Sequence, residues 1–235
     1  MADVLTLPIR TIVRSTPLTR VIRLNLGDIP FAFHAGQAAN IGLHGQSLRR
    51  PYSIASAPDD TSRYGRLEFL IKVDAQGLAG LHLDGMTPGS RIDLEGPFGS
   101  FTMPPQSDAS SFLFVAGGTG ISPMRSIWRQ LDAAGDRRPI AVLYSARTSD
   151  EFAYAAELKR MARRRGISLA MTVTGAVPSQ WEGVSGRIGR EQLARALPST
   201  DPMCFLCGPQ SLVDDVSQHL RQIGLPPARI RTEEW

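Results

Sequence analysis

Cysteine and lysine are both scarce in this sequence of 235 residues. It contains two cysteines, Cys204 and Cys207, and its only lysines are Lys72 and Lys159. So few cysteines exclude a disulfide scaffold and a four-cysteine iron–sulfur cluster held by this chain. The 26 basic residues exceed the 22 acidic ones by a net charge of +4, which is too small by itself to indicate nucleic-acid binding.

Long apolar runs are also missing. A membrane-spanning helix needs about 18 apolar residues, and the longest candidate, Phe112–Met124, is interrupted by three glycines. The start, Met1–Val4, lacks the charged and then apolar pattern of a signal peptide. We therefore expect a soluble, cytoplasmic protein that binds neither a membrane nor nucleic acid and has no metal site.

The first hundred residues contain short apolar segments separated by turn signals such as Gly27–Pro30 and Thr87–Ser90. Period-two alternation predicts strands, and several short strands at this spacing favour an antiparallel barrel. The predicted strands are Leu18–Leu26, Ala39–Leu43, Tyr52–Ala55, Arg66–Val73 and Arg91–Leu94. We also predict a turn at Ala57–Asp60 and a linker at 103–108.

After the linker, buried strands alternate with helices. Strands are predicted at Phe112–Ala116, Ile140–Tyr144, Ser168–Val173 and Met203–Cys207. One helix should begin at Ser122 as N-cap with Pro123 following and end at Gly135, and a second should run from about Asp150 to Arg165. This alternation is typical of a doubly wound parallel sheet.

Gly117–Gly120 stands between a predicted strand and a predicted helix. Backbone N–H groups and a helix N-terminus at such a place favour an anion, and phosphate is the natural guest. The alternative is a tight turn that needs glycine for its geometry alone. The loop is neither a G-x-G-x-x-G fingerprint nor a P-loop, which disfavours ATP chemistry.

Four motifs occur in a characteristic order: Arg50–Ser53, Gly96–Gly99, Gly117–Pro123 and Cys207–Pro209. Together they resemble the signature set of the ferredoxin-NADP reductase superfamily of flavoproteins. The resemblance covers the chain from about residue 20 to its end. It implies a flavin-binding antiparallel Greek-key β-barrel at 1–105, followed by an NAD(P)-binding α/β doubly wound parallel sheet at 106–235.

The resemblance also implies where a flavin would bind, FAD being expected and FMN possible. Arg50 would pair with the flavin phosphate, Tyr52 would supply an aromatic face, and Ser53 would bring a catalytic hydroxyl near the reactive nitrogen. The remaining flavin candidates are Pro51, Ile71, Lys72, Gly77 and Gly80. Gly80 stands where many relatives have a serine on the pyrophosphate, which leaves the identity and retention of the flavin open.

For the nicotinamide coenzyme, the resemblance places the pyrophosphate at the glycine loop and the nicotinamide beside Cys207. The coenzyme candidates are Gly117, Gly118, Thr119, Gly120, Pro123, Ser145, Arg147, Arg187, Cys207, Gly208, Pro209 and Trp235. Arg147 and Arg187 match two of three arginines that NADP-dependent relatives use, while Thr174 occupies the third place. NADPH is therefore only slightly favoured over NADH.

Catalytic roles are implied for Ser53, Cys207, Glu233 and the terminal Trp235, which would cover the flavin until nicotinamide displaces it. A separation of three sends the strand side chains of Cys204 and Cys207 to opposite faces, which disfavours a disulfide or a shared metal between them. Cys204 is expected to pack in the core. Hydride would pass from nicotinamide to flavin, and electrons would then pass to a separate protein.

We expect that acceptor to be an acidic electron carrier, ferredoxin or flavodoxin, or an oxygenase component, and we expect the chain to be a monomer. Two alternatives stay open: a reductase of free flavins, which the glycine at position 80 favours, and a non-catalytic flavin-binding subunit of a larger complex. A basic helix face at Lys159–Arg165 could dock a partner, although a solvated face is the more ordinary explanation.

Overall fold

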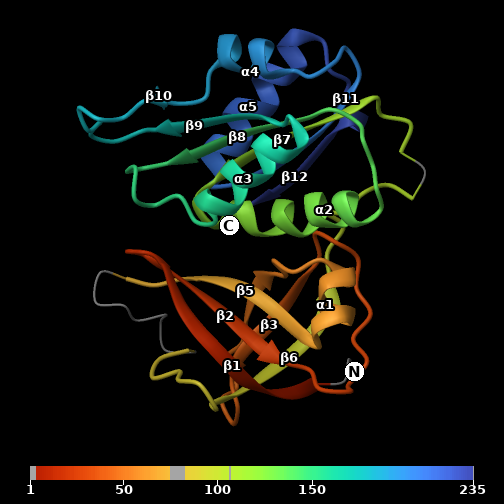
Figure 1. Cartoon of the computed structure of the whole chain (residues 1–235), viewed down its shortest axis with the longest axis vertical. Helices are drawn as coiled ribbons and strands as arrows, with labels where there is room; N and C mark the ends of the chain where they lie inside the picture. The colour runs from red at the N-terminus through yellow and green to blue at the C-terminus, as the bar shows by residue number, and fades with distance from the viewer. Residues whose placement is uncertain (1–3, 75–82, 106, 235) are drawn as a thin grey trace. The chain divides into compact units, whose positions relative to one another are not determined.

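The computed structural model describes residues 4–74, 83–105 and 107–234 (Figure 1). The chain forms two compact units: Met1–Met103 with Arg125–Asp136, and Pro104–Met124 with Arg137–Trp235. The predicted domain boundary at residue 105 stays a prediction. No helix within the described ranges is both long enough and apolar enough to span a membrane.

The first unit is built on a six-stranded antiparallel sheet. Its strands are β1 (Val4–Thr16), β2 (Thr19–Asn25), β3 (Ala38–Leu43), β4 (Arg50–Ser53), β5 (Arg66–Lys72) and β6 (Arg91–Phe98). They lie in the order β4-β3-β6-β1-β2-β5, and a bridge between Ile54 and Phe69 joins the two edges. The predicted antiparallel barrel is therefore confirmed.

Alternation along the strands fills the barrel. Ile22 lies opposite Phe69, and Leu24 lies opposite Leu67, and all four side chains are fully buried in one apolar cluster. Because strand side chains alternate between faces, the residues between these positions point away from the barrel interior. The period-two pattern of the sequence thus sets the register of β2 and β5.

Two elements of this unit were not predicted. Strand β1 is the longest of the barrel, and its pairing with β2 shifts register between Ile9 and Thr11 and again between Arg14 and Thr16. Helix α1 (Pro58–Tyr64) replaces the predicted turn. It has proline in its first turn, acidic Asp59 and Asp60 beside its N-terminus, and a left-handed Gly65 (φ 60°) as its C-cap.

The second unit contains a six-stranded parallel sheet, as predicted. Its strands are β7 (Ser111–Gly117), β8 (Ile140–Ala146), β9 (Ser168–Val173), β10 (Val184–Ser185), β11 (Pro202–Gly208) and β12 (Ile230–Glu234). The helical elements that follow the linker are a 3-10 turn η1 (Gly118–Gly120), α2 (Ile121–Ala133), α3 (Ala155–Arg165), α4 (Arg190–Ala196), α5 (Gln210–Ile223) and a 3-10 turn η2 (Pro227–Arg229).

Apolar side chains cover the parallel sheet in two layers. One layer joins Leu113, Val115 and Leu206 to Leu193 of α4 and Val216 of α5. Phe112, Phe114 and Phe205 alternate with these residues along their strands and so lie on the other face of the sheet. The rings of Phe114 and Phe205 stack there with their centroids 5.3 Å apart. Strands buried on both faces explain the continuous apolar runs in the sequence.

The predicted helix starts need correction. Helix α2 begins at Ile121 directly after η1, so Ser122 is inside the helix and is not its N-cap. The Ser122 hydroxyl is buried and has no hydrogen-bond partner within the described part of the chain. Helix α3 begins at Ala155, later than predicted, after a left-handed Tyr154 (φ 58°). Helix α5 was not predicted, although Val213, Val216 and Leu220 mark one buried helical face.

The strand order of the parallel sheet is β10-β9-β8-β7-β11-β12. The chain winds outward from β7 through β8, β9 and β10, and then returns to place β11 and β12 on the other side of β7. Ligands of open α/β sheets bind at the carboxyl ends of the strands where the winding direction reverses. In this unit that point lies between the carboxyl ends of β7 and β11.

Candidate active site

The carboxyl edge of the parallel sheet gathers most of the predicted coenzyme residues. Gly117 at the end of β7 lies beside Ser145 of β8, and Cys207 of β11 lies beside Ala116 on one side and Glu233 of β12 on the other. Four segments far apart in the sequence therefore converge at the switch point. Their order across the edge follows directly from the parallel register.

The glycine loop and the Cys207–Pro209 segment approach each other backbone to backbone. A Cβ atom added to Gly120 would lie 2.2 Å from the Cys207 carbonyl oxygen, and one added to Gly117 would lie 2.9 Å from Pro209 Cδ. Gly118 has a left-handed φ of 54° and open space around its Cα. Glycine at these positions thus serves close packing at Gly117 and Gly120 and the sharp turn at Gly118.

This arrangement fits a phosphate-bearing ligand. Thr119 is half-buried in η1, and Pro123 lies in the first turn of α2, where its missing N–H costs no helical hydrogen bond. The first N–H groups of a helix have no intrahelical partner and attract anions. Three of the four residues 117–120 are glycines, so this loop presents mainly backbone at the switch point, which suits a pyrophosphate.

Cys207 and Glu233 are neighbours across two strands. The Cys207 Sγ lies 3.9 Å from the Glu233 Oε2, which is within the range of a weak S–H donor. Cys207 is buried, whereas Glu233 is half-buried. Both cysteines are free thiols, and Cys204 packs in the apolar layer under α5 as predicted, where burial raises the pKa of its thiol to about 12.

The two arginines expected near a 2′-phosphate follow the carboxyl ends of β8 and β10. Arg147 is exposed, and its backbone N–H donates to the Glu151 carboxylate over 3.3 Å. The Arg187 guanidinium is exposed and lies 3.5 Å from Asp215 on α5. Thr174 donates its hydroxyl to the Ala146 carbonyl. The acidic partners Glu151 and Asp215 were not predicted, because no spacing rule connects them to the arginines.

Four of the predicted flavin residues, Arg50–Ser53, form β4, an edge strand of the barrel sheet. Strand β4 pairs with β3, Tyr52 opposite Ala39 and Ser53 opposite Ala38. Pro51 is tolerated here because an edge strand leaves one side of its backbone unpaired. Tyr52 is half-buried against the barrel core, and burial raises the pKa of its phenol to about 12, although the nearby Arg50 lowers it.

These residues fit a flavin in their chemistry. Tyr52 is uncharged at neutral pH and offers an aromatic surface, Ser53 is a buried hydroxyl, and Arg50 is an exposed cation on the same strand. A flavin needs all three, because its ring is flat and apolar, its edge is polar and its phosphate is anionic.

Other predicted flavin residues are less directly placed. Ile71 is fully buried in the barrel core, so a ligand contact from it would have to use its backbone. Lys72 is exposed at the end of β5. Gly77, Gly80 and Trp235 lie outside the described residues. Within the described ranges, no group of three or more His, Cys, Asp or Glu side chains is arranged to hold a metal ion.

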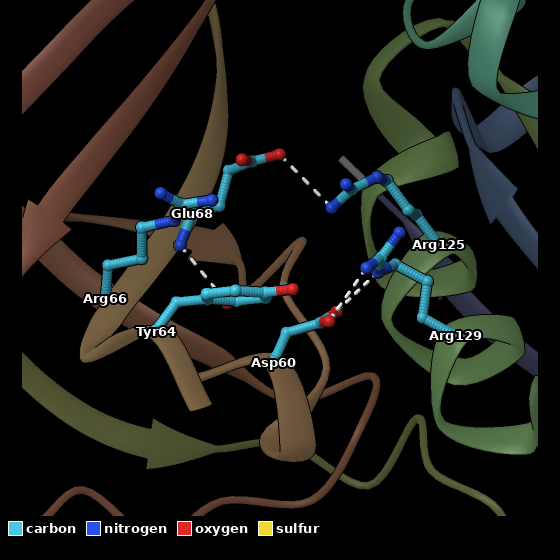
Figure 2. A pocket seen from close by; sticks show the side chains of 7 residues that line it. Asp60, Tyr64, Arg66, Glu68, Arg125 and Arg129 are labelled. Carbon is cyan, nitrogen blue, oxygen red and sulfur yellow. Dashed lines mark hydrogen bonds and ion pairs between the residues drawn. The ribbon is translucent and has the colours of Figure 1, made fainter. Parts of the chain in front are cut away.

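A separate polar recess in the first unit was not predicted (Figure 2). Arg125 and Arg129 reach into it from α2, and Glu68 and Asp60 face them from β5 and α1. Glu68 accepts from Arg23 at 2.6 Å and lies 3.1 Å from Arg125. Two nitrogens of Arg129 bind the two oxygens of Asp60. Figure 2 also shows Arg66 stacked against the Tyr64 ring, 5.1 Å from its centre.

The side chains of the recess take part in bonds that hold α2 against the barrel. Arg125 also donates to the Ala55 carbonyl at 2.6 Å, and Ser126 donates to the Ser56 carbonyl at 2.7 Å. Burial raises the pKa of Asp60, but the bond and charge of Arg129 outweigh it and leave this pKa below its usual value. The two carboxylates are thus held by arginine, and together these bonds fix the Arg125–Asp136 part of the first unit to the barrel.

Comparison with known proteins agrees with this geometry. The oxidoreductase FAD-binding domain family matches residues 7–103, and the oxidoreductase NAD-binding domain family matches residues 114–218. The chain is 35% identical to ferredoxin–NADP reductase B of Sorangium cellulosum, covering 94% of this chain and 93% of that protein.

A second relative is longer than this chain. The reductase component of propane 2-monooxygenase from Rhodococcus jostii is 30% identical over 93% of this chain but is covered over only 61% of its own length. Among solved structures, a ferredoxin NADP+ reductase from Neisseria gonorrhoeae with bound FAD and NADP superposes with a TM-score of 0.83. It is 20% identical and covers 100% of this chain and 99% of its own, which shows the shared fold.

The full-length match to the Sorangium protein, the two domain families and the fold all agree with the family that the sequence motifs resemble. The FAD-binding family coincides with the barrel, and the NAD-binding family coincides with the parallel sheet. The chain is therefore an oxidoreductase that binds FAD and a nicotinamide coenzyme, and it belongs to the ferredoxin–NADP reductase superfamily.

Proposed function

We propose that this chain oxidises NADPH or NADH with its bound FAD and delivers the electrons to a separate acceptor protein. The observation that carries the proposal is the convergence of the glycine loop, Cys207 and Glu233 at the switch point of the parallel sheet. When bound, FAD accepts a hydride and releases electrons one at a time, which converts a two-electron donor into one-electron steps.

Each protein group has a distinct task in this proposal. The backbone of Gly117–Gly120 and the start of α2 bind the coenzyme pyrophosphate, and Pro209 and Gly208 shape the space beside it. Arg147, Arg187 and Ser145 bind the adenosine end. Arg50, Tyr52 and Ser53 bind and orient the flavin, with Lys72 and the backbone of Ile71 nearby. Cys207 and Glu233 hold and move a proton near the nicotinamide, and Trp235 covers the flavin between turnovers.

The acceptor is proposed to be an acidic electron carrier of the ferredoxin or flavodoxin type, or an oxygenase component. The names of the Sorangium and Rhodococcus relatives support these two classes, and the net charge of +4 suits an acidic partner. We further propose that the chain acts as a monomer with a flavin domain at 1–105 and a coenzyme domain at 106–235.

An anaerobic titration of the purified chain tests the proposal. The protein should stay yellow after desalting, and its flavin absorption should bleach with one equivalent of NADPH or NADH and return when an acidic ferredoxin is added. A colourless protein that reduces added flavin would instead establish a free-flavin reductase. A yellow protein that neither coenzyme bleaches would establish a non-catalytic subunit.

Glu233 provides a matched test of the proton-handling role. Glu233→Gln should slow flavin reduction by about 100-fold or more, the lower end of the range for loss of a general acid or base. Glu234→Gln changes the next residue of the same strand, whose side chain points to the other face, and should leave the rate unchanged. Equal rates for both variants would remove Glu233 from the proposed machinery.

A further inference from the structure

Tyr144 of β8 reaches the glycine loop with its hydroxyl. The side chain is fully buried, and its hydroxyl donates a 2.9 Å hydrogen bond to the Gly118 carbonyl oxygen. The Tyr144 hydroxyl oxygen itself accepts a 3.2 Å hydrogen bond from the Ala153 backbone N–H, just before α3. One phenol therefore connects three separate segments of the second unit.

The ring of Tyr144 is held by aromatic neighbours. Phe152 packs edge-on against it at 5.0 Å, and Trp181 stacks on Phe152 with centroids 5.5 Å apart and planes 4° from parallel. Trp181 in turn donates from Nε1 to the Val184 carbonyl at 2.9 Å. Because three aromatic rings pack in series, the hydroxyl is fixed in position before any ligand binds.

Burial raises the pKa of the Tyr144 phenol well above its ordinary value, so the group stays protonated and remains a donor at any physiological pH. Its acceptor is the residue with the unusual backbone: Gly118 has a φ of 54° and begins the 3-10 turn that leads into α2. A carbonyl bonded to Tyr144 is turned toward β8, and it does not present its negative end to an anion at the loop.

We propose that Tyr144 is a positioning residue of the coenzyme site, which holds the glycine loop in the conformation that binds pyrophosphate. This inference rests on the proposed function, because it assigns the loop to the coenzyme. Tyr144 needs no contact with the ligand: it withdraws the Gly118 carbonyl and leaves the loop's N–H groups as the groups that face the phosphates. The pyrophosphate is common to NADPH and NADH, so Tyr144 should affect both equally.

The test is Tyr144→Phe in the full chain, which removes one oxygen and keeps the packed ring. Dissociation constants for NADP+, NAD+ and ADP-ribose are measured by calorimetry, and the thermal midpoint is recorded without nucleotide. Loss of one hydrogen bond should weaken all three ligands by about twofold to tenfold, with an unchanged ratio between NADP+ and NAD+. The rate of flavin reduction at saturating NADPH should stay within about twofold, since the loss falls on binding.

Two further variants make the result specific. Tyr64→Phe removes an exposed hydroxyl in the barrel unit and should change no dissociation constant. Phe152→Leu loosens the aromatic packing but keeps the Tyr144 hydroxyl, and it should weaken ADP-ribose less than Tyr144→Phe does. A larger loss for Phe152→Leu would overturn the proposal in favour of ring packing alone.

Unchanged affinities in Tyr144→Phe, or a loss confined to NADP+, would also overturn it. Failure of the assignment of the glycine loop to the coenzyme looks different, because the unmodified chain would then bind none of the three nucleotides.

Discussion

Arginine provides nearly all the cations of this chain, and single side chains therefore act as planar forks rather than as point charges. At the carboxyl edge of the parallel sheet, Arg147 and Arg187 are exposed. In the first unit, Arg125 is only 8% exposed and fully engaged with Glu68 and a backbone carbonyl. The same residue type is thus exposed where we propose that it recognises a ligand, and buried where it takes part in packing.

Arg147→Gln tests recognition at the first of these places. Only NADPH carries a 2′-phosphate, so its KM should rise by about tenfold, the value of one lost charge-assisted hydrogen bond, while the KM for NADH stays within about twofold. Steady-state kinetics with both coenzymes measure this split. Arg160→Gln, on an exposed position of α3, is the control, and an equal rise for both coenzymes would contradict the assignment.

The carboxyl of a single residue, Asp93, makes the stability of the fold depend on pH. Burial raises the pKa of its carboxyl, but hydrogen bonds from Thr6 Oγ1 at 2.7 Å and His44 Nδ1 at 2.8 Å outweigh burial and lower this pKa below its ordinary value. A carboxyl with a lowered folded-state pKa stabilises the fold above the unfolded-state pKa of about 3.9. That contribution is lost as the pH falls through the folded-state pKa.

We therefore expect Asp93→Asn to lower the free energy of unfolding at pH 7 by about 1–2 kcal/mol. The difference from the unmodified chain should shrink as the pH falls below about 4. Denaturant titrations between pH 3 and pH 7 measure it. Asp28→Asn, at an exposed position, should behave like the unmodified chain, and a difference for Asp93→Asn that stays constant with pH would rule out the ionised carboxyl as the cause.

At the scale of elements, α2 is the clearest case of a helix held by charge. Its Arg125 and Arg129 bind Glu68 of β5 and Asp60 of α1 (Figure 2). Glu68 is 5% exposed and lies between Arg23 and Arg125. Removing one partner of a buried ion pair leaves the other charge uncompensated, which costs far more than the pair itself contributes.

Glu68→Gln should therefore lower the free energy of unfolding by about 3–5 kcal/mol. Glu191→Gln removes the same charge from an exposed pair with Arg195 on α4 and should cost no more than about 0.5 kcal/mol. Thermal and denaturant unfolding of the two variants, followed by the far-ultraviolet signal, compares them directly. Similar losses would mean that the buried network does not hold the helix.

Elements with an uninterrupted pattern could be predicted from the sequence. Ser168–Val173 matches β9, because a buried strand bounded by glycine and turn residues has clear ends. Strand β1 could not be predicted, because two register shifts in its pairing with β2 interrupt the alternation of its side chains. Helix α1 could not be predicted either, because only Thr61 among its residues is buried, so it has no apolar periodicity to detect.

The candidate site was predictable in its motifs but not in its contacts. The glycine loop and Cys207–Pro209 are visible as short patterns. The pairing of Cys207 with Glu233 depends on the register of β11 with β12, and the bond from Tyr144 to Gly118 depends on the register of β8 with β7. Spacing along one strand carries no information about register with a distant one.

For the whole molecule, the division into a barrel unit and a parallel-sheet unit places the candidate flavin residues Arg50–Ser53 in one unit and the candidate coenzyme loop Gly117–Gly120 in the other. The excess of basic over acidic residues gives the chain a net charge of +4. A mild positive charge accelerates encounter with an acidic partner, and salt screens that attraction over about 10 Å at 0.1 M.

The rate of electron delivery should therefore depend on salt in a partner-specific way. Between about 20 mM and 300 mM salt, kcat/KM for an acidic ferredoxin should fall several-fold. Turnover with an uncharged quinone, supplied with saturating NADPH, should change little over the same range. Stopped-flow and steady-state measurements distinguish the two, and a salt-independent ferredoxin rate would mean that charge does not guide docking.

Because the chain has only two lysines, an amine-reactive reagent can label only two of its side chains. Lys72 lies exposed at the end of β5 in the barrel unit, and Lys159 lies exposed on α3 in the parallel-sheet unit. Acylation followed by mass spectrometry therefore reports on one lysine side chain in each unit. The extent of acylation at Lys159 serves as an internal reference. Binding of flavin near Lys72 can then be measured as a slower acylation of that one amine, without any engineered label.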